Sequence, residues 1–206
     1  GRKLWGGIVN ETRNLVRQTK VYLGSRRELV DRITHLTIAF AWSTMYHLRG
    51  KQELDKAIRY FSPEEVEDLM KTTHLPLACA RRITEALEMA RIEGVLDPIR
   101  QVAVEHNLEQ LVDYLGACER IHKTPLPFAY VIHLRRALLL YALSLPFVLV
   151  ETFGWGTIAA TFAISYIMFG IEEIGVEIED PFGYDDNDLP LEQICEGIEK
   201  RLLNDV

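Results

Sequence analysis

The sequence lacks the patterns on which most enzymes and nucleic-acid-binding proteins depend. It contains no glycine-rich phosphate loop, no serine-centred nucleophile elbow, and no HExxH or similar zinc-binding spacing. Its 23 Lys and Arg are outnumbered by 30 Asp and Glu, which gives a formal net charge of −7, whereas nonspecific nucleic-acid binding needs a basic surface. We therefore expect neither an enzyme nor a nucleic-acid-binding protein.

Cysteine is scarce and follows no motif. Cys79, Cys118 and Cys195 are the only three, and none belongs to a CxxC pair. An odd, unpatterned set indicates reduced thiols in a cytosolic setting, where they act as small buried hydrophobic residues. A catalytic alternative pairs Cys118 with His122 four residues later, but no third group that would orient them is visible.

The sequence also lacks sustained two-residue alternation of apolar and polar residues, so strands are not expected. Apolar residues instead recur at spacings of three and four, and Ser62 before Pro63 is a typical helix start. The helical segments predicted before residue 125 are 2–20, 26–49, 63–71, 75–93 and 98–121. We predict an all-α fold with a helical region over residues 1–125.

A mean hydropathy of +0.00 conceals two long apolar runs in the second half of the chain. Residues 137–150 and 153–171 contain no charged side chain, and the second run is long enough to span a bilayer. Glu151 and Thr152 lie between the runs at a predicted turn, where Trp155 is typical of a membrane interface. We therefore predict a membrane helical hairpin over residues 126–178. The alternative is a buried helical hairpin in a soluble protein.

Basic residues orient this predicted hairpin. Arg135 and Arg136 lie at the start of the first run, and further Lys and Arg precede them. Because positive charge favours the cytoplasmic side, the helical region and residues 179–206, an acidic loop followed by a last helix, are both expected in the cytoplasm. The chain begins at Gly1, inside a helical pattern, so we expect that an N-terminal part precedes it.

Negative charge is concentrated directly after the apolar runs. Residues 172–191 carry eight carboxylates. Glu172, Glu173 and Glu177 at the end of the second run either attract ions electrostatically or simply mark where the helix leaves the membrane.

Asp185, Asp186 and Asp188 follow on a short loop. Their carboxylates are suitable ligands for a hard cation such as Ca²⁺. Alternatively, Asp188 is the N-cap of a helix over 191–203, or the loop is solvated charge.

Three stretches resemble a known family. They are GRKLWGGIVNETRNLVRQ at 1–18, CERIHKTPLPFAYVIHLRR at 118–136 and GIEEIGVEIEDPFGYDDNDLPLEQIC at 170–195. The last two are long and specific, and the match covers essentially the whole chain. The sequence resembles the bestrophin ion channels, in their bacterial, fungal and plant branch.

The resemblance implies a subunit of a homo-pentamer embedded in membrane lipid, with a central pore for small monovalent ions. Chloride and similar anions are the expected cargo. A cation-conducting homologue and a non-conducting helical membrane scaffold remain as alternatives. No cofactor is required, although Ca²⁺ is a candidate, and the protein is expected to be an integral protein of a cell or organelle membrane.

The resemblance also assigns candidate sites. Ile99, with Leu96 one turn before it, corresponds to the apolar cytosolic aperture of the pore, and the alternative for both is ordinary core packing. A Ca²⁺ clasp known in animal members would take side-chain ligands from Asp185 and Asp188 and backbone carbonyls from Glu177 and Asp180. Bacterial and plant members often lack this ion. The hydrophobic neck of the family's pore would precede Gly1.

Overall fold

The computed structural model describes residues 1–124, 127–177, 180–185 and 187–204, with the backbone alone at residues 55, 176 and 177. The chain divides into two compact units, Gly1–Lys123 with Leu189–Val206, and Thr124–Asp188. Across the described ranges the regular elements are all helical, which confirms the predicted all-α fold.

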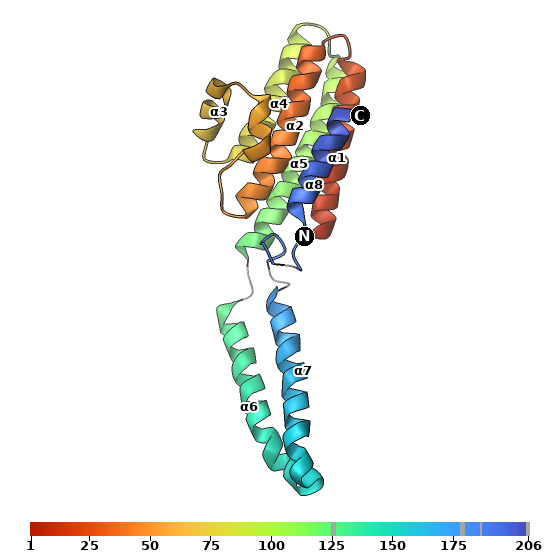
Figure 1. The fold of residues 1–206 in the computed structure, drawn as a ribbon. Coiled ribbons are helices and arrows are strands. Elements are labelled where there is room, and N and C mark those ends of the chain that lie inside the picture. Colours follow the sequence, from red (N-terminus) through yellow and green to blue (C-terminus); the bar gives the residue numbers. More distant parts are fainter. Residues whose placement is uncertain (125–126, 178–179, 186, 205–206) are drawn as a thin grey trace. The chain divides into compact units, whose positions relative to one another are not determined.

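The first unit is a bundle whose helices match the predicted segments closely (Figure 1). Ser62 closes the predicted capping box, because its hydroxyl accepts from the Glu65 N–H while the Glu65 carboxylate accepts from the Ser62 N–H. The elements are α1 (Arg2–Tyr22), α2 (Arg27–Leu48), the 3₁₀ helix η1 (Asp55–Tyr60), α3 (Pro63–Met70), α4 (Leu75–Ile92), α5 (Pro98–Lys123) and α8 (Leu191–Asn204).

Helix α2 is the centre of this bundle. It packs against α1, α4, α5, α8 and η1, and its side chains from Leu36 to Met45 are all buried (Figure 1). Two buried threonines of the helix are satisfied locally, since the hydroxyls of Thr34 and Thr37 donate to the carbonyls of Val30 and Ile33 at 2.8 and 2.7 Å. A helix surrounded on all sides explains why its sequence is apolar on more than one face.

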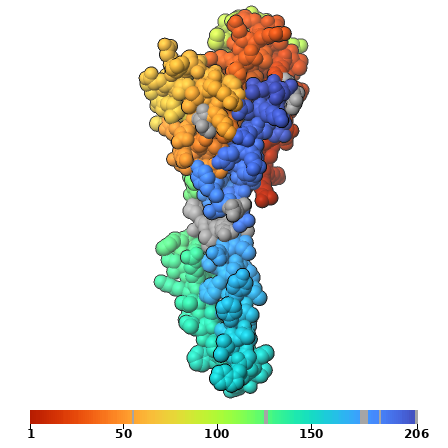
Figure 2. All heavy atoms as spheres, viewed as in Figure 1, coloured from red at the N-terminus to blue at the C-terminus, as the bar shows by residue number. Residues whose placement is uncertain are grey.

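A buried carboxylate joins α8 to the rest of the bundle. Glu199 on α8 is 5 % exposed and accepts hydrogen bonds from the indole N–H of Trp42 at 3.3 Å and from Arg59 and Tyr60. Figure 2 shows the blue surface of α8 beside the orange surface of the segment that precedes α3. Burial alone would raise the pKa of Glu199, but the bonds from Tyr60, Arg59 and Trp42 outweigh it, so the pKa is lowered.

Replacing this carboxylate should destabilise the bundle. Glu199→Gln is expected to lower the free energy of unfolding by about 2 kcal/mol at neutral pH, because charge-assisted hydrogen bonds are lost. The thermal midpoint of the detergent-purified chain should then fall by about 4–8 °C. Because the folded-state pKa is depressed, the stabilisation is complete above the ordinary carboxyl pKa of about 4.3 and disappears as the pH falls through the folded pKa.

The matched control is Glu196→Gln, one turn earlier on α8, where a half-exposed carboxylate pairs with Lys56. A surface pair of this kind contributes at most about 1 kcal/mol. Equal midpoints for the two variants at neutral pH would show that Glu199 does not hold α8 in place.

The second unit is a helical hairpin. Helix α6 (Phe128–Phe153) and α7 (Thr157–Glu177) lie side by side, joined by the short 3₁₀ helix η2 (Gly154–Gly156) (Figure 1). Gly154 ends α6 with φ +50°, a left-handed conformation that favours glycine, and this residue allows the chain to reverse. Pro146 lies within α6, as the membrane interpretation tolerates.

The surface of this hairpin is apolar and exposed. The segment Phe128–Gly175 is long and apolar enough to cross a membrane, with a mean hydropathy of 1.8, and only 6 % of its most apolar stretch is buried. Large side chains are exposed on both helices and on η2, among them Phe147, Trp155 and Phe162, which are 82, 92 and 74 % exposed. A hairpin in the core of a soluble protein would be mostly buried, so the structure favours the membrane alternative.

The hairpin unit ends at Asp188, ten residues after the predicted boundary at residue 178. The acidic loop through Asp188 belongs to the hairpin unit, whereas α8 belongs to the bundle, where it packs on α1 and α2.

The N-cap interpretation of Asp188 is wrong. Helix α8 begins at Leu191, three residues later, and the Asp188 carboxylate instead accepts from the Asp185 N–H at 2.8 Å.

Candidate functional site

The predicted aperture residues lie at the start of α5 and differ in exposure. Asp97 caps this helix, since its Oδ1 accepts from the N–H groups of Ile99 and Arg100 at 2.8 and 3.4 Å. The side chain of Ile99 is 81 % exposed, whereas Leu96 is 2 % exposed. Burial favours the core-packing alternative for Leu96, and exposure leaves Ile99 available to line a pore.

The acidic loop is organised by its own carboxylates. Asp188 Oδ2 accepts from the Asp185 N–H, Asp185 accepts through its carbonyl from the Asp188 N–H at 2.9 Å, and Asp180 Oδ1 accepts from the Phe182 N–H at 3.2 Å. A Cβ at Gly183 would lie 2.7 Å from Asp188 Oδ2, so any other residue there would displace the Asp188 carboxylate. The loop is therefore a set of Asp-closed turns.

The four residues of the predicted Ca²⁺ clasp belong to the described part of the chain, where Glu177, which would contribute its carbonyl, is described through its backbone alone. The neighbouring Asp186 lies outside the described residues. Within the described part of the chain, the loop carboxylates do not form a group of three ligand atoms within 4.8 Å of one another. The Ca²⁺ site stays a prediction.

The two glutamates near the end of α7 have different surroundings. Glu172 Oε1 lies 2.7 Å from Nε of Arg135 on α6, and its side chain is only 10 % exposed. Glu173 is exposed. An opposite charge in direct contact cancels most of the field of Glu172, so ion attraction at this end of the hairpin would depend on Glu173.

The cysteines are free and buried, as predicted. Burial raises the pKa of the Cys118 thiol to about 11. A nucleophilic cysteine needs a thiolate at neutral pH, so this residue is unsuited to the catalytic alternative.

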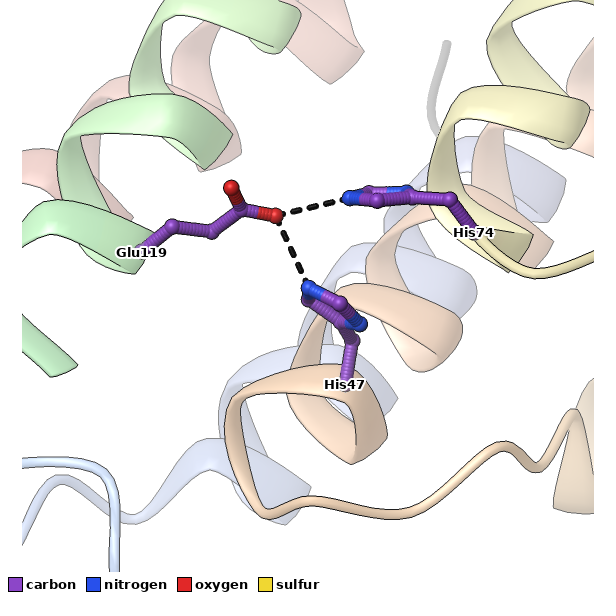
Figure 3. Close-up of side chains that lie close together, drawn as sticks. All are labelled: His47, His74 and Glu119. Atoms are coloured by element: carbon purple, nitrogen blue, oxygen red, sulfur yellow. Dashed lines mark hydrogen bonds and ion pairs between the residues drawn. The ribbon is translucent and has the colours of Figure 1, made fainter. Parts of the chain in front are cut away.

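A cluster that the sequence did not reveal lies in the bundle. His47 from the last turn of α2, His74 immediately before α4, and Glu119 near the end of α5 converge (Figure 3). Oε1 of Glu119 lies 2.8 Å from Nε2 of His47 and 2.7 Å from Nε2 of His74, and the ring centroids are 4.3 Å apart. One carboxylate oxygen thus contacts both imidazoles.

Burial and neighbouring groups shift the pKa values of the cluster residues in opposite directions. The pKa of His47 is lowered, first by burial and then by the neighbouring His74, although Glu119 acts in the opposite direction. Burial would raise the pKa of Glu119, but hydrogen bonds from His74 and His47 outweigh it, and this pKa is lowered too. The arrangement therefore favours an ionised carboxylate facing a neutral His47 ring.

Sequence spacing carried no signal for this cluster. The three residues are separated by 27 and 45 positions, and they lie in or beside three different helices. Only the packing of α2, α4 and α5 brings them together.

Comparison with known proteins identifies the family. The family described as bacterial/fungal bestrophin protein matches residues 1–204. The chain is also 42 % identical over 212 residues to a voltage-dependent anion channel-forming protein of Nostoc sp., with 98 % of this chain and 67 % of the relative covered. The chain belongs to the bestrophin family. A second relative with the same description, from Synechocystis sp., is 41 % identical over 210 residues with the same coverage.

Solved bestrophin structures have the same fold. A crystal structure of a mutant bacterial bestrophin homolog from Klebsiella pneumoniae matches with a TM-score of 0.93 and 33 % identity, covering 98 % of this chain and 76 % of that one. Another match, described as a membrane protein, has a TM-score of 0.94 at 32 % identity and the same coverage. Together with the exposed apolar hairpin, these matches confirm the predicted bestrophin-like fold and an integral membrane protein.

Proposed function

We propose that this bestrophin is a subunit of an anion channel that conducts chloride and similar monovalent anions passively. The observation that carries the proposal is the 42 % identity, over 98 % of the chain, to a relative described as a voltage-dependent anion channel-forming protein. The exposed apolar hairpin supports it, because each subunit offers lipid-facing helices. Channel function also agrees with the inert, buried Cys118 and argues against an enzyme.

We further propose that five copies surround the pore, with the bundle in the cytoplasm. The two helices of this hairpin are too few to enclose a pore, so further copies of the chain, further segments of the full-length protein, or both would supply the rest. The basic residues at the start of α6, Arg135 and Arg136, favour the cytoplasmic side for that end of the hairpin.

Ion flux tests the main proposal. The full-length protein reconstituted in liposomes should pass chloride down a gradient, and the reversal potential should follow the anion gradient. Mass measurement of the detergent-solubilised complex should give five subunits. A reversal potential that follows the cation gradient would support the cation-conducting alternative, and flux equal to that of empty liposomes would support a scaffold.

Ile99 is proposed as the side chain that forms the cytosolic aperture. Its 81 % exposure at the capped start of α5 leaves an apolar side chain in water unless other subunits or a pore surround it. A ring of five such side chains would narrow the pore and disfavour its hydration, so that ions pass partly dehydrated.

Shortening this side chain should ease ion passage. Ile99→Ala is expected to raise single-channel conductance and to weaken discrimination between small and large anions, because the aperture becomes wider and better hydrated. Planar-bilayer recordings would measure both. Ile92→Ala, which shortens an equally apolar side chain that is 71 % exposed at the end of α4, is the control and should leave currents unchanged. Unaltered currents in Ile99→Ala would exclude this residue from the pore.

The acidic loop is proposed as a Ca²⁺ site that uses Asp185 and Asp188 with the carbonyls of Glu177 and Asp180. Its support is the number of oxygen ligands on one short loop that Asp180 and Asp188 close into turns. If Ca²⁺ binds, Asp185→Ala combined with Asp188→Ala should abolish any dependence of current on Ca²⁺.

Asp188→Asn separates binding from turn formation. The amide oxygen can still accept from the Asp185 N–H, but the ligand charge is gone, so the fold should persist while Ca²⁺ binding weakens. If the current of the parent protein does not depend on Ca²⁺, the loop has a structural role only.

A further inference from the structure

Two imidazoles and a carboxylate converge in the bundle without an assigned role. His47, His74 and Glu119 each direct one ligand atom toward a common point, and all these atoms lie within 4.8 Å of one another (Figure 3). From this convergence we infer that the cluster binds a divalent transition-metal ion of the zinc type. The inference concerns the bundle alone and does not depend on ion conduction.

The donor set selects the class of ion. Two neutral imidazole nitrogens and one carboxylate oxygen are the ligands of three-residue zinc sites, in which water takes the fourth position. Hard cations such as Ca²⁺ and Mg²⁺ prefer oxygen ligands throughout, so they are poor occupants. This ligand set therefore differs in kind from that of the acidic loop.

The access and rigidity of the cluster suit an exchangeable ion. The side chains of His47, His74 and Glu119 are 27, 27 and 19 % exposed, so an ion can reach them from solvent while most of the cluster is sheltered. The ligands come from three segments that the bundle core fixes in position, which limits the ordering needed on binding.

The present distances require only a small adjustment. Tetrahedral coordination at about 2.0–2.1 Å separates donor atoms by about 3.3 Å. Glu119 Oε1 lies 2.7–2.8 Å from the two imidazole nitrogens, so the rings and the carboxylate must part by roughly half an ångström to admit the ion.

Two features of the cluster oppose metal binding, and one of them provides a further test of the inference. Nδ1 of His74 accepts weakly from the Leu77 N–H at 3.4 Å, so the ring must move its proton to Nδ1 when Nε2 binds the metal, and this helix cap is lost. Lys123 Nζ lies 3.5 Å from Glu119 Oε2 and repels a cation there. Removing the lysine charge should therefore strengthen binding, a result not expected for ions bound elsewhere.

Calorimetry with Zn²⁺ on tag-free, chelator-treated full-length protein in detergent tests the site. One ion per chain is expected, and Co²⁺ at the same site should give the visible absorption bands of tetrahedral coordination. His47→Gln and Glu119→Gln should each weaken binding at least about tenfold. His106→Gln is the control, because its Nδ1 faces Glu109 at 3.7 Å on an exposed surface with no third ligand, and it should bind like the parent.

Lys123→Gln provides a test that does not depend on whether a ligand variant folds. This residue is 66 % exposed, so its replacement should not affect folding, and Zn²⁺ should bind a few-fold more tightly at low ionic strength. The inference is overturned if the parent binds no Zn²⁺, if His47→Gln and His106→Gln bind equally, or if Lys123→Gln leaves the affinity unchanged. Each of these results is independent of whether the protein conducts anions.

Discussion

The exposed apolar surface of the hairpin is the constraint on which the rest of the structure depends. Helices α6 and α7 cover only a small part of each other, and their remaining side chains are stable in contact with lipid or with other subunits rather than water. Every backbone group inside such a surface must be satisfied within its own helix, which accounts for two long helices joined by a short turn at Gly154. The membrane location follows from this requirement.

The bundle is stabilised by a different principle. Its centre is α2, which is buried from Leu36 to Met45, and several polar groups are hydrogen-bonded inside the core rather than placed at the surface. Glu199 is the main example: an ionised carboxylate is tolerated there because three donors from α2 and η1 reach it. The same contacts attach α8, which follows the hairpin in sequence, to helices that precede it. The segments before and after the hairpin thus form one folded unit.

Local patterns predicted the helices well, since each depends on residues close together in sequence. The capping box at Ser62 and the helices on either side of the hairpin turn are of this kind. The N-cap role of Asp188 failed for a related reason. Its carboxylate found a nearer donor in the Asp185 N–H, and a proline, Pro190, separates it from the first residue of α8. Spacing alone could not separate the exposed Ile99 from the buried Leu96, because Leu96 lies before the Asp97 cap and outside α5, so the two residues do not share a helical face.

By itself the sequence determined the helical class, the apolar hairpin and, through three specific stretches, the bestrophin family, because each is written in short runs of adjacent residues. The tertiary structure alone decided which side chains meet across the bundle. His47, His74 and Glu119 lie far apart along the chain, and Arg135 and Glu172 belong to opposite arms of the hairpin. Contacts of this kind depend on how helices pack, and packing is set by the whole core rather than by any local pattern.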